Sequence, residues 1–165
     1  MRILRPLIAA SALLAAGAAL AGTANNTFQV TATVVSACTV SGSALNFGNA
    51  IDPLASATPV DASSTLSVQC TATTPYTVAL NAGANAGGGS NFGARVMKSG
   101  ANSIGYQLYL DAGRSSIWGD GTASSTVSGT GTGSAQNLTI YGRLPSLSNV
   151  VPGSYSDTVT VTVSY

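Results

Sequence analysis

The sequence predicts an all-β protein in which about six to seven short strands form a β-sandwich. Three observations support this prediction. Apolar residues alternate with serine and threonine at a period of two in several runs, which is the pattern of a half-buried strand. Stretches rich in glycine, proline and asparagine separate these runs and mark turns. Beyond residue 21, no run shows the sustained apolar stripe of an amphipathic helix.

Each predicted strand rests on its own alternation. In the first strand, Phe28, Val30, Ala32 and Val34 share one face, and threonine and glutamine side chains occupy the other. The clearest run is residues 155–165, where valine alternates with threonine, and such β-branched residues favour a pleated strand over a helix. The remaining strands are predicted at residues 35–40, 66–71, 76–80, 104–110 and 138–140.

The first 21 residues have the features of a secretory signal peptide. Arg2 and Arg5 precede the apolar run from Leu7 to Leu20, and Ala19-Leu20-Ala21 ends this run with small residues at both key positions. The run is shorter than the about 20 apolar residues that a transmembrane helix needs, although an uncleaved anchor is the alternative. We expect cleavage after Ala21, which leaves residues 22–165 as one exported domain.

Composition argues against several classes of function. Charged residues make up 7% of the chain, and histidine is absent, which removes the usual catalytic triads, most zinc sites and the commonest general base. The formal net charge of +1 becomes slightly negative once Arg2 and Arg5 are removed, so no basic surface for nucleic acid is expected. We therefore expect no enzymatic activity, no cofactor, no metal and no small-molecule substrate.

The two cysteines, Cys38 and Cys70, are expected to form a disulfide. An exported protein with an even number of cysteines normally pairs them, and here only one pairing is possible. Both cysteines lie in predicted strands, so the bond would join two strands. A reactive or metal-binding thiol pair is the alternative, but neither histidine nor a Cys-x-x-Cys spacing supports it.

The N-terminal strand, residues 27–34, has no partner that can be identified from the sequence. One interpretation pairs it within its own sandwich. The other leaves the sandwich one strand short, with the N-terminal segment of a neighbouring molecule completing it, since exposed sheet edges and open grooves favour strand addition. Periodicity alone does not decide between these interpretations.

Several short motifs occur in the order found in a known family. They are Cys38-Thr39-Val40, Asn46-Phe47-Gly48, Val68-Gln69-Cys70, Pro75-Tyr76, residues 106–111 (YQLYLD), residues 118–121 (WGDG), residues 141–145 (YGRLP) and residues 153–158 (GSYSDT) with the strand that follows to Tyr165. Together they resemble the spore coat protein U domain, which is shared with the pilin subunits of archaic chaperone–usher pili. The resemblance covers residues 26–165.

This resemblance implies an incomplete immunoglobulin-like sandwich. Members of the family are kept soluble by a periplasmic chaperone, passed to an outer-membrane usher, and polymerised when the N-terminal strand of one subunit completes the groove of the next. The expected protein is thus a structural subunit of a surface pilus or coat that supports adhesion and biofilm formation. Tip adhesins of related systems carry an additional domain, so this chain is expected to be a shaft or adaptor subunit.

The resemblance also assigns roles to two sets of residues. The donor strand, within residues 22–35, would insert Phe28, Val30, Ala32 and Val34 into the groove of another sandwich, which residues 36–165 form. The acceptor groove and the chaperone-docking strand would be lined by Val159, Val161, Val163 and Tyr165, with a contribution from the strand that contains Cys38.

Few other residues are candidates for chemistry. Asp111 and Asp120 lie on either side of Trp118 in the sequence, and two carboxylates near a tryptophan are one arrangement found in glycoside hydrolases. We instead interpret Asp111 as the end of a strand and Asp120-Gly121 as a turn. Trp118 is expected to be a buried aromatic anchor. If it were exposed, it would favour the alternative function, a secreted surface-binding module that does not polymerise.

Overall fold

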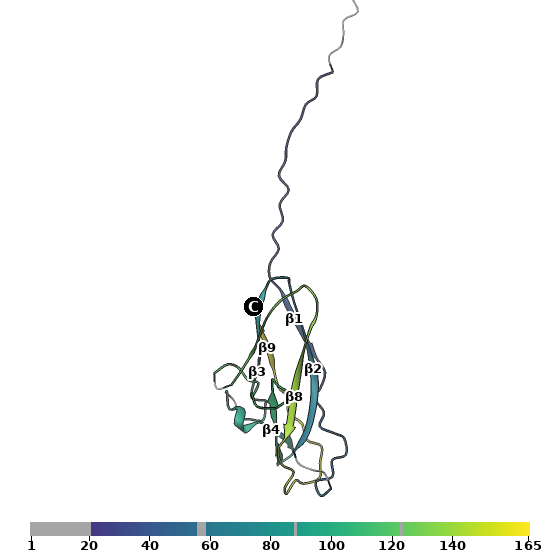
Figure 1. Cartoon of the computed structure of the whole chain (residues 1–165), viewed down its shortest axis with the longest axis vertical. Helices are drawn as coiled ribbons and strands as arrows, with labels where there is room; N and C mark the ends of the chain where they lie inside the picture. The colour runs from purple at the N-terminus through teal and green to yellow at the C-terminus, as the bar shows by residue number, and fades with distance from the viewer. Residues whose placement is uncertain (1–20, 56–58, 88, 123) are drawn as a thin grey trace, which may run out of the picture. The chain divides into compact units, whose positions relative to one another are not determined.

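The computed structural model describes residues 21–55, 59–87, 89–122 and 124–165 (Figure 1). Apart from Ala21, the predicted signal peptide lies outside these residues. The chain divides into two units, one ending at Thr33 and the other running from Val34 to Tyr165. Within the first unit, residues 21–33 carry no strand, and the side chains of Phe28 and Val30 are 87% and 82% exposed.

The second unit is a β-protein with no α-helix among its described residues. Among the described residues, no helix is long and apolar enough to span a membrane. The elements, in chain order, are β1 (Cys38–Gly42), β2 (Val60–Cys70), β3 (Pro75–Leu80), the 3₁₀ helix η1 (Phe92–Ala94), β4 (Val96–Ser99), β5 (Asn102–Gly105), β6 (Gln107–Tyr109), β7 (Val127–Thr130), β8 (Gln136–Leu144) and β9 (Val161–Ser164).

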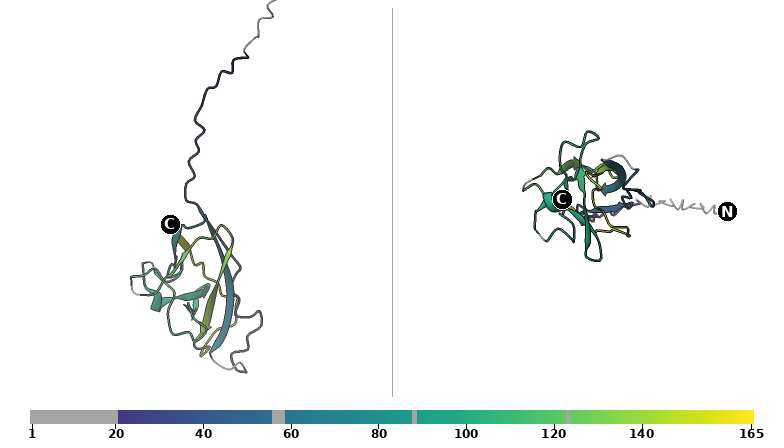
Figure 2. Two further views of the ribbon diagram at one scale, coloured as in Figure 1. Left: turned by 45° about the horizontal axis from the view of Figure 1, so that its top comes forward. Right: turned by 90° about the horizontal axis from the view of Figure 1, so that it is seen from below.

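Two antiparallel sheets form the sandwich. One has the strand order β1-β2-β8-β6 and the other β7-β3-β9, while β4 and β5 make a small separate hairpin. The long strands β2 and β8 lie side by side through the middle of the larger sheet (Figure 2). Alternate residues of β2 and β3 face inward and are buried, so the period-two pattern of the sequence becomes the interior of the fold.

Trp118 anchors the core between the sheets. Its side chain is fully buried, and its indole Nε1 donates a hydrogen bond of 3.1 Å to the carbonyl of Val78 on β3. This satisfies the polar atom of the ring while its apolar surface packs inside. The aromatic anchor predicted from the sequence is therefore present, and Trp118 has no exposed face with which to contact a surface.

The structure corrects several predicted strands. The described residues hold nine strands rather than six or seven, in part because β4 and β7 have only four residues each and are too short to show a clear alternation. The predicted strand at residues 104–110 is divided at Tyr106, whose N–H donates to the carbonyl of Arg95, so that β5 and β6 belong to different sheets.

The predicted strand at residues 155–165 is mostly replaced by an irregular edge, and regular pairing begins only at Val161. Here a side chain takes the place of a backbone acceptor in the pairing with the segment after β3. The N–H of Thr160 donates to the side-chain oxygen of Asn81 instead of to a backbone carbonyl. The strands predicted at residues 76–80 and 138–140 are confirmed within β3 and β8, and the strand predicted at residues 66–71 is confirmed as far as Cys70, where β2 ends. The strand predicted at residues 35–40 begins only at Cys38, as β1.

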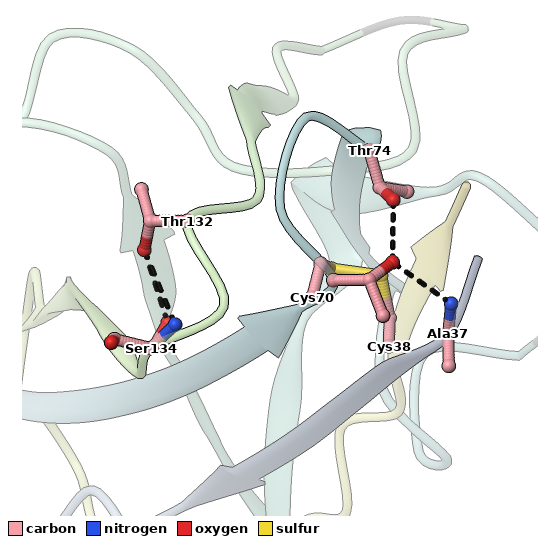
Figure 3. Close-up of a disulfide and its surroundings, with 7 residues drawn as sticks. Ala37, Cys38, Cys70, Thr74, Thr132 and Ser134 are labelled. Carbon is pink, nitrogen blue, oxygen red and sulfur yellow. Dashed lines mark hydrogen bonds between the residues drawn. A yellow bond between two sulfur atoms is a disulfide. The ribbon is translucent and has the colours of Figure 1, made fainter. Parts of the chain in front are cut away.

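The predicted disulfide is confirmed. Cys38 and Cys70 are direct partners in the register of β1 and β2, and the bond between them joins these two neighbouring strands (Figure 3). The preceding residue, Ala37, donates its N–H to the hydroxyl of Thr71 and accepts the N–H of Thr71 at its carbonyl. The beginning of β1 is thus fixed to β2 by one covalent bond and two hydrogen bonds.

Candidate functional site

The sandwich has two neighbouring sheet edges, β1 and β9. Strand β1 is the outermost strand of the larger sheet, β9 is the outermost strand of the smaller one, and the two strands lie close to each other. An edge strand carries a row of backbone donors and acceptors that a further strand can pair with. What matters is which of these groups face the space between β1 and β9.

On β1, the hydrogen bonds to β2 identify the outward-facing groups. Ala37 bonds to Thr71, and the N–H of Ser43 donates to the carbonyl of Thr65. Because bonding alternates along an antiparallel ladder, the backbone groups of Cys38, Val40 and Gly42 point away from β2.

The edge at β9 follows the same rule. The N–H of Asn81 donates to the carbonyl of Thr160 at 3.0 Å, so Thr160 faces the rest of its sheet. By alternation, the backbone groups of Val159, Val161 and Val163 point away from β3. Both edges therefore present one backbone donor and one acceptor at every second residue, which is what an inserted strand requires.

A groove lined largely by apolar side chains lies between these edges. Its volume is about 480 Å³, and a second hollow of about 770 Å³ adjoins it. Val40 shows that the groove exposes the interior: it pairs with the fully buried Val68 and so faces the same side, yet it is 39% exposed. Residues that line the groove include Val40, Leu66, Leu80, Leu108, Ile140, Val159 and Val161.

The segment after β1 forms one wall of both hollows. Leu45 and Phe47 are half-buried and approach Gly142 on β8 so closely that a Cβ atom there would lie 2.9 Å from each side chain. Gly142 therefore makes room for these two side chains, and any larger residue at this position would push the segment into the groove.

One polar pair lies in the groove wall. The hydroxyl of Tyr106 donates to Oδ2 of Asp157 at 2.6 Å, and Oδ1 of Asp157 accepts the N–H groups of Asn85 and Thr158. Burial raises the pKa of Tyr106 far above its usual value, and the hydrogen bond to Asp157 raises it further. Tyr106 thus remains a protonated donor that holds the irregular edge at Asp157 against the sandwich. Gly83, at φ +95°, leaves the space that the Asp157 carboxylate occupies.

Comparisons with known proteins identify the family. A model of the spore coat protein U domain matches residues 24–162. The chain belongs to this family. Protein U of Myxococcus xanthus is 36% identical over 169 residues, which cover 95% of this chain and 93% of that protein. Among solved structures, a chain from the complex of CsuC with the tip adhesion subunit CsuE, from the archaic chaperone–usher Csu pili of Acinetobacter baumannii, matches with a TM-score of 0.58 and 28% identity. That match covers 81% of this chain and 40% of the solved one.

The structure places only some of the predicted acceptor residues of this spore coat U domain in the groove. Val159 and Val161 line it. Val163 is half-buried further along β9, and Tyr165 is 60% exposed. The four donor residues, Phe28, Val30, Ala32 and Val34, are exposed, and their role as donors stays a prediction.

Sequence reasoning missed most of the groove lining in this spore coat U domain. Leu45, Phe47, Met97, Tyr106 and Asp157 all contribute to it. Phe47, Tyr106 and Asp157 lie within motifs that carried the family resemblance, and this was the available signal. That Leu45, Phe47 and Met97 line the same groove as Val159 and Val161 depends on how the chain crosses between the sheets, which the alternation of apolar residues does not encode.

The carboxylates considered for catalysis have turn-forming roles in this spore coat U domain. Asp111 accepts the N–H groups of Ser115 and Ser116, and these hydrogen bonds lower its pKa. Asp120 accepts from the hydroxyls of Ser90 and Thr122, which lower its pKa to about 2. Both groups are stabilised as anions, whereas a general acid in a glycoside hydrolase requires a raised pKa.

Proposed function

We propose that this chain is a structural subunit of a surface pilus or coat assembled by a chaperone–usher system. In this proposal, the groove of one molecule takes up the N-terminal segment of another. The observation that carries the proposal is the pair of facing edges, β1 and β9, which leave backbone groups and apolar side chains uncovered along one side of the sandwich.

The N-terminal segment has the chemistry that such a groove requires. Its apolar side chains recur at every second residue and are exposed in the free chain. As an inserted strand, it would bond to β1 on one side and to β9 on the other while these side chains pack inward. Burying Phe28, Val30 and Val34 contributes about 1.5–3 kcal/mol each, and the two ladders add to this, so dissociation would be very slow.

Assembly of this kind is head-to-tail. Each molecule would offer a donor strand and a groove that are different surfaces, so the contact does not close on itself and the product is an open filament or coat. Before assembly, the uncovered groove needs protection from aggregation. A periplasmic chaperone is the partner proposed for this role, since the similar solved structure is a chaperone–subunit complex before assembly. An outer-membrane usher and a location at the cell surface complete the proposal.

The test compares two faces of the proposed donor strand. The unmodified chain from residue 22 onward should run on a detergent gel as a ladder of polymer bands that collapses to the monomer only after strong heating. Val30→Asp in this chain places a charge on the inward face and should abolish the ladder. The matched control, Thr31→Asp, places the same charge on the outward face and should retain the ladder. Added peptide 22–36 should form a one-to-one complex with the Val30→Asp chain, as measured by native mass spectrometry. Equal behaviour of the two variants would contradict the proposal.

A further inference from the structure

The proposed donor strand is joined to the sandwich by a very short tether. Val34 is the last of its four predicted donor residues, and Ala37 is already fixed to Thr71 by hydrogen bonds of 2.9 and 3.2 Å. Cys38 then forms the disulfide to Cys70 (Figure 3). Because these bonds prevent the start of β1 from separating from β2, only Val35 and Ser36 connect the donor strand to a fixed point.

The directions of the two groove edges determine how a strand can enter. Strand β1 is antiparallel to β2, and β9 is antiparallel to β3. Strand β2 ends at Cys70 and β3 begins at Pro75, so both of these ends lie at the same end of the sandwich. It follows that β1 and β9 run in opposite directions. An inserted strand is therefore antiparallel to one edge and parallel to the other.

A strand antiparallel to β9 cannot come from the same molecule. In that direction Phe28 lies near the start of β1 and Val34 lies about 20 Å further along, at a rise of about 3.3 Å per residue. The chain would then have to return to Ala37 in three residue steps, which span at most about 11 Å. The tether is too short by about half.

A strand antiparallel to β1 would instead form a hairpin with it. A two-residue loop at Val35-Ser36 sets Thr33 opposite Cys38 and Thr31 opposite Val40. Since directly opposed residues share a face and Val40 lines the groove, this register turns the threonines inward and the apolar donor residues outward.

The turn residues also count against a short hairpin in this direction. The favoured two-residue turns require a positive φ, which a β-branched residue such as Val35 avoids. A three-residue loop restores the apolar face, but it removes Val34 from the strand and places Ser36 in the left-handed region, where glycine is preferred.

We propose that the Val35-Ser36 tether, fixed at Ala37 and Cys38, prevents each molecule from closing its own groove. In the assembled state, the occupant is then the N-terminal segment of a second copy. This inference rests on the proposed function and adds the reason why strand insertion joins molecules instead of completing a monomer.

The experiment lengthens the tether. An insertion of about sixteen glycine and serine residues after Ser36 spans roughly 20–24 Å as a flexible chain, which is enough for the donor strand to enter its own groove antiparallel to β9. We expect this variant to be a monomer at every protein concentration, measured by size-exclusion chromatography with light scattering. The intensity of its polymer bands on the detergent gel should fall at least about tenfold. The matched control carries the same insertion between Gly22 and Thr23, ahead of the donor strand, and should polymerise like the unmodified chain.

Peptide binding shows whether the groove of the monomer is filled. The tether variant should not bind added peptide 22–36, whereas the same variant with Val30→Asp should bind it. A tether variant that still polymerises, or a monomer that still binds the peptide, overturns the inference. If the Val30→Asp chain without an insertion fails to bind the peptide, the proposed function fails, and the inference fails with it. If that chain binds the peptide and the tether variant still polymerises, only the inference about the tether fails.

Discussion

Two valines show how two sides of the sandwich differ. We call the side with the groove between β1 and β9 the open side, and the region around Val78 and Trp118 the closed side. Val78 on β3 has β7 and β9 as neighbouring strands, is fully buried, and accepts the indole N–H of Trp118 at its carbonyl. Val40 on β1 faces the same interior, but it lies at a sheet edge beside the groove and is 39% exposed. Both side chains face inward, but Val78 has a paired strand on each side, whereas Val40 has a paired strand on one side only.

The largest expected effect is on the closed side. Trp118→Ala removes a fully buried ring and the hydrogen bond that its indole donates to the carbonyl of Val78, which should cost about 3–5 kcal/mol of unfolding free energy. That is a large part of the stability of an ordinary domain. Urea unfolding should be measured in the Val30→Asp background, which keeps the chain monomeric.

Val40→Ala is the matched variant on the open side. Since Val40 is already partly exposed, its truncation should cost well under half as much as the Trp118 substitution in the free chain. Addition of peptide 22–36 should enlarge the cost, because an inserted strand would cover this side chain. Equal costs for Val40→Ala with and without the peptide would show that the groove is not filled next to β1.

The disulfide is expected to have the second-largest effect, since it supports the open side. Cys38 and Cys70 are 32 residues apart in the chain, and closing a loop of this length contributes about 3–4 kcal/mol by restricting the unfolded chain. Replacing both cysteines with serine should lower the urea midpoint in the same background and reduce the periplasmic yield. Ser41→Ala, on the same strand, is the control and should leave both quantities nearly unchanged. An unchanged midpoint in the double variant would show that the hydrogen bonds at Ala37 hold β1 without the disulfide.

The closed side was more predictable from sequence than the open side. Alternation identified β3 and parts of β2 and β8, where apolar side chains on the inward face are buried or half-buried. It failed at residues 155–160, where the side chain of Asn81 replaces a ladder partner, and at Tyr106, where the chain passes from one sheet to another. The period-two pattern reports which way a side chain points, but the number of strands that cover it depends on long-range pairing.

The smallest expected effect concerns the turn at Asp120 and its contribution to stability in acid. Hydrogen bonds from Ser90 and Thr122 lower the pKa of Asp120 from 3.8 to about 2. A carboxyl whose folded pKa is depressed stabilises the fold above its unfolded pKa, and this stabilisation is lost as the pH falls from about 3.8 towards 2. Asp120→Asn should therefore flatten the decline of the urea midpoint between pH 5 and pH 2.

Ser90→Ala separates the hydrogen bond from the charge of Asp120. It keeps the carboxylate but removes the donor that lowers its pKa most, so it should flatten the decline partly and less than Asp120→Asn does. Because the groups involved are exposed, both changes should be small beside those at Trp118 and the disulfide. If Asp120→Asn keeps the full decline, the acid sensitivity arises elsewhere. The next carboxylate to examine would then be Asp61, whose hydrogen bond to Arg143 lowers its pKa at the surface of the larger sheet.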